Sequence, residues 1–140
     1  MRNSLRTLGR IKKFELDELQ RRLAAELEQE ESLTGKIKKL TADYEAEKLF
    51  AMQNPGIGDF GAYTDLYLKR RRALEEKLEA VRRRIENLRD EMAAAFKERK
   101  TYEIVDENRQ QRRRKEIDAR EQKTLDEIGT NAYIKKHHET

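Results

Sequence analysis

Apolar residues recur at alternating steps of three and four along two long stretches, and this spacing constrains the fold more than any other feature. The first row consists of Leu16, Leu19, Leu23, Glu26, Glu30, Leu33, Ile37, Leu40 and Tyr44. The second consists of Tyr67, Arg71, Leu74, Leu78, Val81, Ile85, Leu88, Met92, Ala95, Arg99 and Tyr102. A repeat of 3.5 residues with charges elsewhere allows two helices to bury one narrow stripe against each other. We call these rows the seam, and they predict a coiled coil.

Helix-breaking residues are concentrated between the two rows, in residues 53–61. This segment holds the only proline, Pro55, and three of the six glycines. Asn54 and Pro55 are expected to end the first helix, and Asp59 is a candidate N-cap for the second. A loop of about nine residues joins antiparallel helices, since a parallel return needs a longer connection. The sequence therefore predicts an all-α, two-helix antiparallel coiled-coil hairpin.

The two stretches differ in length, so the hairpin is expected to have an overhanging C-terminal end. We predict a single coiled-coil domain over 1–140, with helix 1 at about 5–52, loop 53–61, helix 2 at about 62–128 and tail 129–140. With the turn near position 57, Leu5 lies opposite Arg109, and later residues lack a partner within the chain. Their sparse apolar row (Ile117, Leu125, Ile128) favours a partner-binding helix over a disordered tail, and Gly129 and Asn131 are its expected stop.

Four seam positions are charged: Glu26, Glu30, Arg71 and Arg99. Polar residues inside a coiled coil lower its stability and are used to fix the register. The antiparallel pairing predicts that Glu30 lies near Arg84 and that Glu26 lies near Leu88. The alternative is that these side chains extend to solvent from a partly wet region.

The apolar stripe broadens near the loop. The residues concerned are Leu40, Tyr44, Leu49, Phe50, Phe60, Tyr63, Leu66, Tyr67 and Leu68. They cannot all face one seam, so they either pack the loop end or form an exposed contact patch.

Composition excludes several classes of protein. Charged residues form 43% of the chain and mean hydropathy is −1.10, which leaves too little apolar material for a compact core with an enclosed pocket. No apolar run approaches the roughly 18 residues of a membrane span, and no apolar segment of a signal peptide follows the N-terminus. Cysteine is absent, and His137 and His138 are adjacent and do not share a helix face. We therefore expect a cytoplasmic protein that is not an enzyme, with no cofactor, no metal and no membrane insertion.

Three basic runs, at residues 69–72, 82–84 and 112–115, suggest phosphate binding at first sight. Consecutive residues wrap around a helix, however, and each run is flanked by glutamates. Steering of an acidic protein partner fits this pattern better than nucleic acid does. A nucleic-acid-binding coiled coil remains as an alternative.

The whole chain resembles the FliJ family of bacterial flagellar export proteins; components of type III injectisomes are similar. The more specific segments are residues 40–45 (Leu-Thr-Ala-Asp-Tyr-Glu), the start of helix 2 from Tyr63 to Leu66, and residues 121–128 (Glu-Gln-Lys-Thr-Leu-Asp-Glu-Ile). Lys48 and Arg70 depart from the family's pattern, which has an aromatic and an apolar residue there.

The resemblance implies a component of the flagellar type III export apparatus that is a central stalk in the hexameric export ATPase. It also implies coupling of that ATPase to the export-gate protein, export-chaperone handling and a location at the cytoplasmic face of the inner membrane. The implied gate contacts are Leu40, Tyr44, Tyr63, Leu66 and Ala73. The implied ATPase contacts are Arg112, Arg113, Arg114, Gln122, Lys123, Leu125 and Asp126. A prefoldin-like holdase is a further alternative, although residues 53–61 offer no strand pattern for its β-hairpins.

Overall fold

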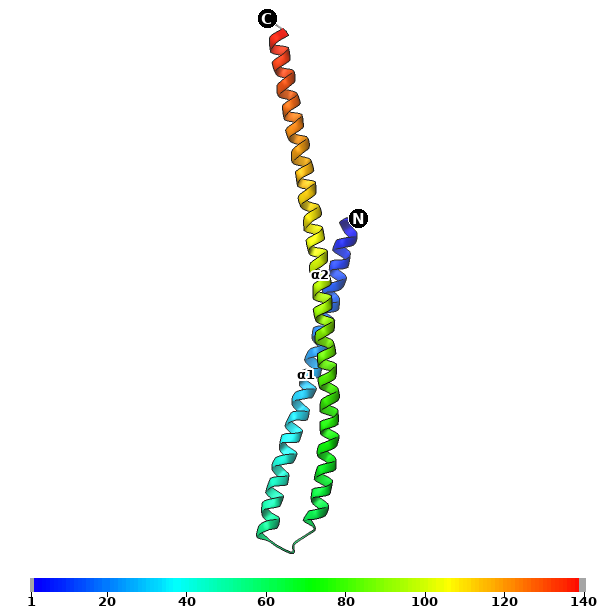
Figure 1. The fold of residues 1–140 in the computed structure, drawn as a ribbon, viewed down its shortest axis with the longest axis vertical. Coiled ribbons are helices and arrows are strands. Elements are labelled where there is room, and N and C mark those ends of the chain that lie inside the picture. The colour runs from blue at the N-terminus through cyan, green and yellow to red at the C-terminus, as the bar shows by residue number, and fades with distance from the viewer. Residues whose placement is uncertain (1, 139–140) are drawn as a thin grey trace. The chain divides into compact units, whose positions relative to one another are not determined.

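The protein consists of two helices that pack against each other in opposite directions (Figure 1). The structure is a computed structural model that describes residues 2–138, and the side chains of residues 4–137. Helix α1 spans Arg2–Gln53 and helix α2 spans Phe60–His138. No strand occurs within residues 2–138. The predicted all-α antiparallel hairpin is confirmed.

The connection is shorter than predicted and is formed by residues 54–59. The Asn54 amide nitrogen and Nδ2 both donate to the Phe50 carbonyl, at 2.9 Å and 3.0 Å, which closes the end of α1. Gly56 and Gly58 have φ of 88° and 75°, a region that residues with a Cβ rarely enter. Asp59 Oδ1 accepts from the Ala62 amide at 3.1 Å, so Asp59 is the N-cap of α2 as predicted.

Contacts divide the chain into two compact units. One contains Phe14–Phe96, and the other joins the N-terminal segment through Lys13 to the chain from Lys97 onward. The single domain over residues 1–140 stays a prediction.

The Phe14–Phe96 unit is held by the predicted seam. Its buried apolar residues are Leu16, Leu19, Tyr67, Leu78, Val81, Ile85 and Ala95. Leu16, Leu19 and Ala95 form one cluster, against which Leu88 and Met92 pack. The other seam positions of this unit are half-buried, and none is exposed. The repeat of 3.5 residues therefore selected the packed face of both helices.

The smaller unit continues the same pattern on a weaker scale. Leu5, Gly9 and Lys12 on α1 are half-buried, as are the predicted seam residues Arg99 and Tyr102 on α2. Lys12 Nζ lies 2.6 Å from Glu98 Oε2. Beyond Gln110 every described side chain is exposed. We call residues 111–138 the C-terminal extension of α2.

Helix α2 does not stop where the sequence predicted. Gly129 and Asn131 are both helical and α2 continues to His138, so the predicted tail is wrong for residues 129–138. The last two predicted tail residues lie outside the described residues. A single glycine costs a helix only about 1 kcal/mol relative to alanine, and no proline follows that would force an end.

The register also differs from the prediction. Arg84 Nε lies 3.0 Å from Glu26 Oε1, and Arg82 Nε lies 3.5 Å from Glu30 Oε2. Glu26 thus faces Arg84 instead of Leu88, and Glu30 faces Arg82 instead of Arg84. Counting from the middle of the loop gave the predicted register, whereas the actual register follows how side chains pack across the seam, as where Tyr44 stacks on Tyr67.

Candidate functional site

Aromatic side chains fill the end of the hairpin next to the loop. Tyr44 of α1 stacks on Tyr67 of α2 with ring centroids 4.0 Å apart and planes 8° from parallel. Phe60 and Tyr63 lie at 5.6 Å and 6.1 Å from the Tyr44 ring. The Tyr44 hydroxyl lies 3.2 Å from Thr64 Oγ1, so its polar end is also satisfied. Such stacking adds to the burial of apolar area and fixes this end of the hairpin.

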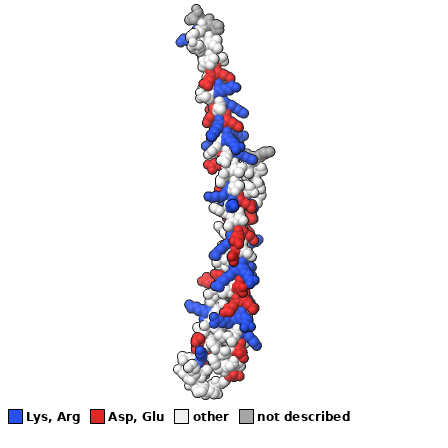
Figure 2. All heavy atoms as spheres, viewed as in Figure 1, with Lys and Arg blue, Asp and Glu red and all other residues white. Residues whose placement is uncertain are grey.

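A second group of apolar side chains near the loop is left exposed. It comprises Leu49, Phe50, Met52, Ile57, Leu66 and Leu68, which are 44–72% exposed. The surplus apolar residues therefore divide between packing of the loop end and exposure to solvent, and a contact patch stays a prediction. In Figure 2 the loop end at the bottom is largely uncharged, and acidic and basic side chains are mixed on the visible face next to it.

The five residues implied as gate contacts fall into three settings. Tyr44 and Tyr63 belong to the aromatic cluster and are half-buried. Leu40 and Ala73 line one groove between the helices. Leu66 is exposed on α2 and lines neither the groove nor the stack. Tyr44 thus lies next to Tyr63, and Leu40 lies in the same groove as Ala73. Binding of a gate protein by these residues stays a prediction.

The residues implied as ATPase contacts all lie on the C-terminal extension and are exposed: Arg112, Arg113, Arg114, Gln122, Lys123, Leu125 and Asp126. Within this set Gln122 Nε2 donates to Asp126 Oδ1 at 3.2 Å, an i,i+4 pair that supports the helix. Leu125 is 62% exposed, Ile117 is 47% exposed and Ile128 is 59% exposed. An apolar row of this kind has no partner among the described residues.

The two seam glutamates form ion pairs across the two helices. Glu26 Oε1 accepts a hydrogen bond from Arg84 Nε, and Arg84 Nη2 also donates to Gln29 Oε1 at 3.4 Å. Glu26 Oε2 is buried without a hydrogen-bond partner. Sequence reasoning selected Glu26 and Glu30 but missed Gln29, because Gln29 lies beside the seam and carries no charge.

Arg71 is the one seam arginine of the Phe14–Phe96 unit, and it is held by its own helix. Its Nε lies 2.9 Å from Glu75 Oε1, and its Nη1 donates to the Tyr67 hydroxyl at 2.7 Å. The hydrogen bond to Glu75 raises the pKa of Arg71 above its ordinary value, and the bond to Tyr67 acts in the same direction. Arg71 therefore stays charged and holds the hydroxyl of Tyr67, which is one ring of the aromatic stack.

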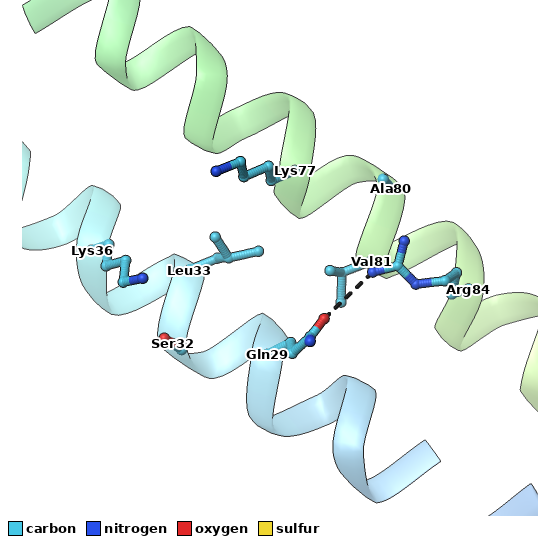
Figure 3. Close-up of a pocket in the computed structure, with 8 residues that line it drawn as sticks. All are labelled: Gln29, Ser32, Leu33, Lys36, Lys77, Ala80, Val81 and Arg84. Carbon is cyan, nitrogen blue, oxygen red and sulfur yellow. Dashed lines mark hydrogen bonds between the residues drawn. The ribbon is translucent and has the colours of Figure 1, made fainter. Parts of the chain in front are cut away.

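A groove between the helices lies near the seam charges. It is lined by Gln29, Ser32, Leu33, Lys36, Lys77, Ala80, Val81 and Arg84 (Figure 3). In this view Leu33 and Val81 project into the space between the helices, and Lys36 and Lys77 lie on opposite helices at one end. None of the eight residues was selected as a binding residue from the sequence, because the groove depends on the register.

Two searches of the described residues bear on chemistry. No group of three or more His, Cys, Asp or Glu side chains within them is placed to hold a metal ion. Neither described helix contains a segment apolar enough over a sufficient length to cross a bilayer.

Comparisons with known proteins give one result. A family model described as "Flagellar FliJ protein" matches residues 1–138. Neither the search of curated proteins nor the search of solved structures gives a match.

Proposed function

The chain belongs to the FliJ family, whose members are structural components of flagellar type III export, and we propose that it acts as the central stalk of the hexameric export ATPase. In this role it has no catalytic activity and couples the ATPase to the export-gate protein. It works in the cytoplasm, at the inner face of the membrane that carries the gate, and takes part in handling export chaperones.

The C-terminal extension carries this proposal. Its side chains from residue 111 to residue 137 are all exposed, yet α2 keeps its helical form through them. Most helical stability in proteins comes from tertiary packing of an amphipathic face, and among the described residues nothing packs against this one. The extension supplies arginines at 112–114 and the apolar residues Ile117, Leu125 and Ile128, so it can combine charge steering with apolar contact on entering a ring.

The loop end of the hairpin is proposed to contact the gate. Its aromatic stack holds the loop end rigid, and exposed Leu66 and Phe50 remain available beside it. Rigid aromatic surfaces with exposed apolar neighbours are typical of binding hot spots. Lys48 and Arg70 are exposed in this half, so the contact is more basic here than the family's pattern implies.

The two alternatives receive less support. A prefoldin-like holdase needs β-hairpins, and residues 2–138 contain no strand. A nucleic-acid-binding coiled coil would bind phosphate through the basic runs, whereas Arg71, Arg82 and Arg83 of these runs are paired with glutamates.

Mixing the protein with the purified flagellar export ATPase at one copy per six subunits tests the stalk role. We expect more hexameric rings by electron microscopy and faster ATP hydrolysis. If neither ring formation nor hydrolysis changes, the stalk role is wrong.

Truncation after Arg109 tests the extension separately. We expect loss of ATPase stimulation, with the ellipticity and melting temperature of the paired hairpin retained. Leu66→Glu is the matched variant at the other end, and it should keep the stimulation while weakening binding of the gate protein in a pull-down. Unchanged stimulation by the truncated chain would show that the ATPase does not use the extension.

A further inference from the structure

One groove runs between α1 and α2 within the Phe14–Phe96 unit. It consists of two neighbouring hollows, and Lys36 lines both of them. On α1 its lining residues are 29, 32, 33, 36, 39, 40 and 43, and on α2 they are 70, 73, 74, 77, 80, 81 and 84. Each set advances by steps of three, one and three, so it lies on one helix face. Fourteen residue steps correspond to about 21 Å of helix.

The floor of this groove is apolar. Leu33, Leu40 and Leu74 are half-buried, and Val81 is buried. Ala73 and Ala80 are exposed and small, so they leave room for a visiting side chain. An apolar stripe with a helical repeat along a groove is what an amphipathic helix needs for docking.

The rim of the groove is basic. It carries Lys36, Lys39, Arg70, Lys77 and Arg84, against one lining carboxylate, that of Asp43. Arg84 is partly neutralised by Glu26. Among the described residues, the other four rim cations form neither an ion pair nor a side-chain hydrogen bond. Outside the groove the described cations are of both kinds, since Arg82 and Arg83 are paired with glutamates whereas Lys38 and Lys69 form no ion pair.

We propose that this groove binds an acidic amphipathic helix of a partner protein, as a third helix beside α1 and α2. Leucine-like residues of that helix cover the floor, and its flanking glutamates or aspartates face the four unpaired cations. A second copy of this chain is a poorer occupant. Its exposed apolar row lies on the extension, together with the arginines at 112–114, and a basic rim would repel these arginines. The groove shares Leu40 and Ala73 with the proposed gate-contact surface. The inference therefore rests on the proposed function and adds the kind of helix that this surface would bind.

The first test uses a synthetic 18-residue helix with Leu at the a and d positions and Glu at the flanking positions. A second peptide replaces each Glu by Lys. We expect the acidic peptide to bind the full chain, with binding weakened by salt, and the basic peptide to show no saturable binding. Saturable binding of the basic peptide alone, or of neither peptide, overturns the proposal.

Matched double variants locate the site. Lys36→Glu with Lys77→Glu should weaken binding of the acidic peptide about ten-fold. Lys38→Glu with Lys69→Glu makes the same change in net charge at exposed positions outside the groove, and we expect a loss of about two-fold or less. Equal losses in both would show general attraction between charges and overturn the groove assignment. Circular dichroism checks that each variant keeps its helices.

Cross-linking distinguishes the occupants. Because the chain has no cysteine, Ser32→Cys places a single thiol in the groove, and Ala93→Cys places one on an exposed position of α2 outside it. A maleimide-bearing acidic peptide should label the first thiol faster than the second. Disulfide-linked dimers of the Ser32→Cys chain, with peptide labelling equal at both thiols, would assign the groove to a second copy instead.

The peptide assay contains no export protein, so its outcome is separate from that of the proposed function. Peptide binding without ATPase stimulation by the wild-type chain would overturn the stalk role alone. Stimulation by the wild-type chain without peptide binding would overturn the groove proposal alone.

Discussion

The paired part of α2 and its C-terminal extension show how similar residues can be used in two ways. Both are rich in Arg, Glu and Lys, and both carry Ile or Leu at intervals. In the paired part Val81 is 2% exposed and Ile85 is 4% exposed, whereas in the extension Leu125 is 62% exposed and Ile128 is 59% exposed. The difference is the presence of α1, since helix propensity and charge content are alike.

Stability and binding depend on different parts of α2. Apolar residues that face α1 stabilise the hairpin, because their burial removes area from water. Apolar residues of the extension add nothing to that burial, so they are available to a partner without loss to the fold.

A pair of isoleucine truncations gives the largest expected contrast. Ile85→Ala should lower the free energy of unfolding by about 2–4 kcal/mol, since it leaves a cavity in the seam. Ile128→Ala should change it by less than about 0.5 kcal/mol, because its side chain is exposed. Urea titration followed by circular dichroism measures both. Similar losses in the two variants would mean that the extension is packed in solution.

Glycine-to-alanine replacements test the same difference between the hairpin and the extension, with smaller expected changes in the free energy of unfolding. Gly35 and Gly129 are both helical, and a Cβ added to either meets no atom within 4 Å. Gly35→Ala should raise the free energy of unfolding of the hairpin by about 0.5–1 kcal/mol. Gly129→Ala should leave that value unchanged and slow hydrogen exchange only at neighbouring amides of the extension. Global stabilisation by Gly129→Ala would contradict the independence of the extension.

Side-chain pairs give the smallest expected effects. A double-mutant cycle on Glu26 and Arg84 should show a coupling of about 0.5–1 kcal/mol in global unfolding, because the pair is partly exposed to solvent. The same cycle on Gln122 and Asp126 should show a coupling close to zero in global unfolding, since that pair joins neighbouring turns of the extension. Coupling of equal size in both cycles would remove the distinction between the two regions.

The sequence was sufficient for the fold because periodicity depends on local spacing. Every predicted seam position is buried or half-buried, and Asp59 caps α2 as predicted. The register was missed by a few residues, because it depends on how side chains pack across the seam, as where Tyr44 stacks on Tyr67, and not on counting from the loop. The end of α2 was missed because a lone glycine such as Gly129 weakens a helix without ending it.

The same distinction between local spacing and register applies to the candidate sites. Residues four apart on one continuous helix, such as Gln122 and Asp126, lie close in any register, and the structure joins these two by a hydrogen bond. The basic groove could not be found in this way, since Lys36 and Lys77 are neighbours only in the correct register. No property of either lysine in the sequence distinguishes it from other exposed lysines.

The narrow seam also has a thermodynamic consequence. Seven described apolar residues are buried, so unfolding transfers little apolar area to water for each residue of the chain. The heat-capacity increment of unfolding depends mainly on that area, and globular domains average about 12–15 cal/mol/K per residue. A smaller increment gives this hairpin a flatter stability curve, with a weak optimum temperature and cold denaturation shifted further below the working range.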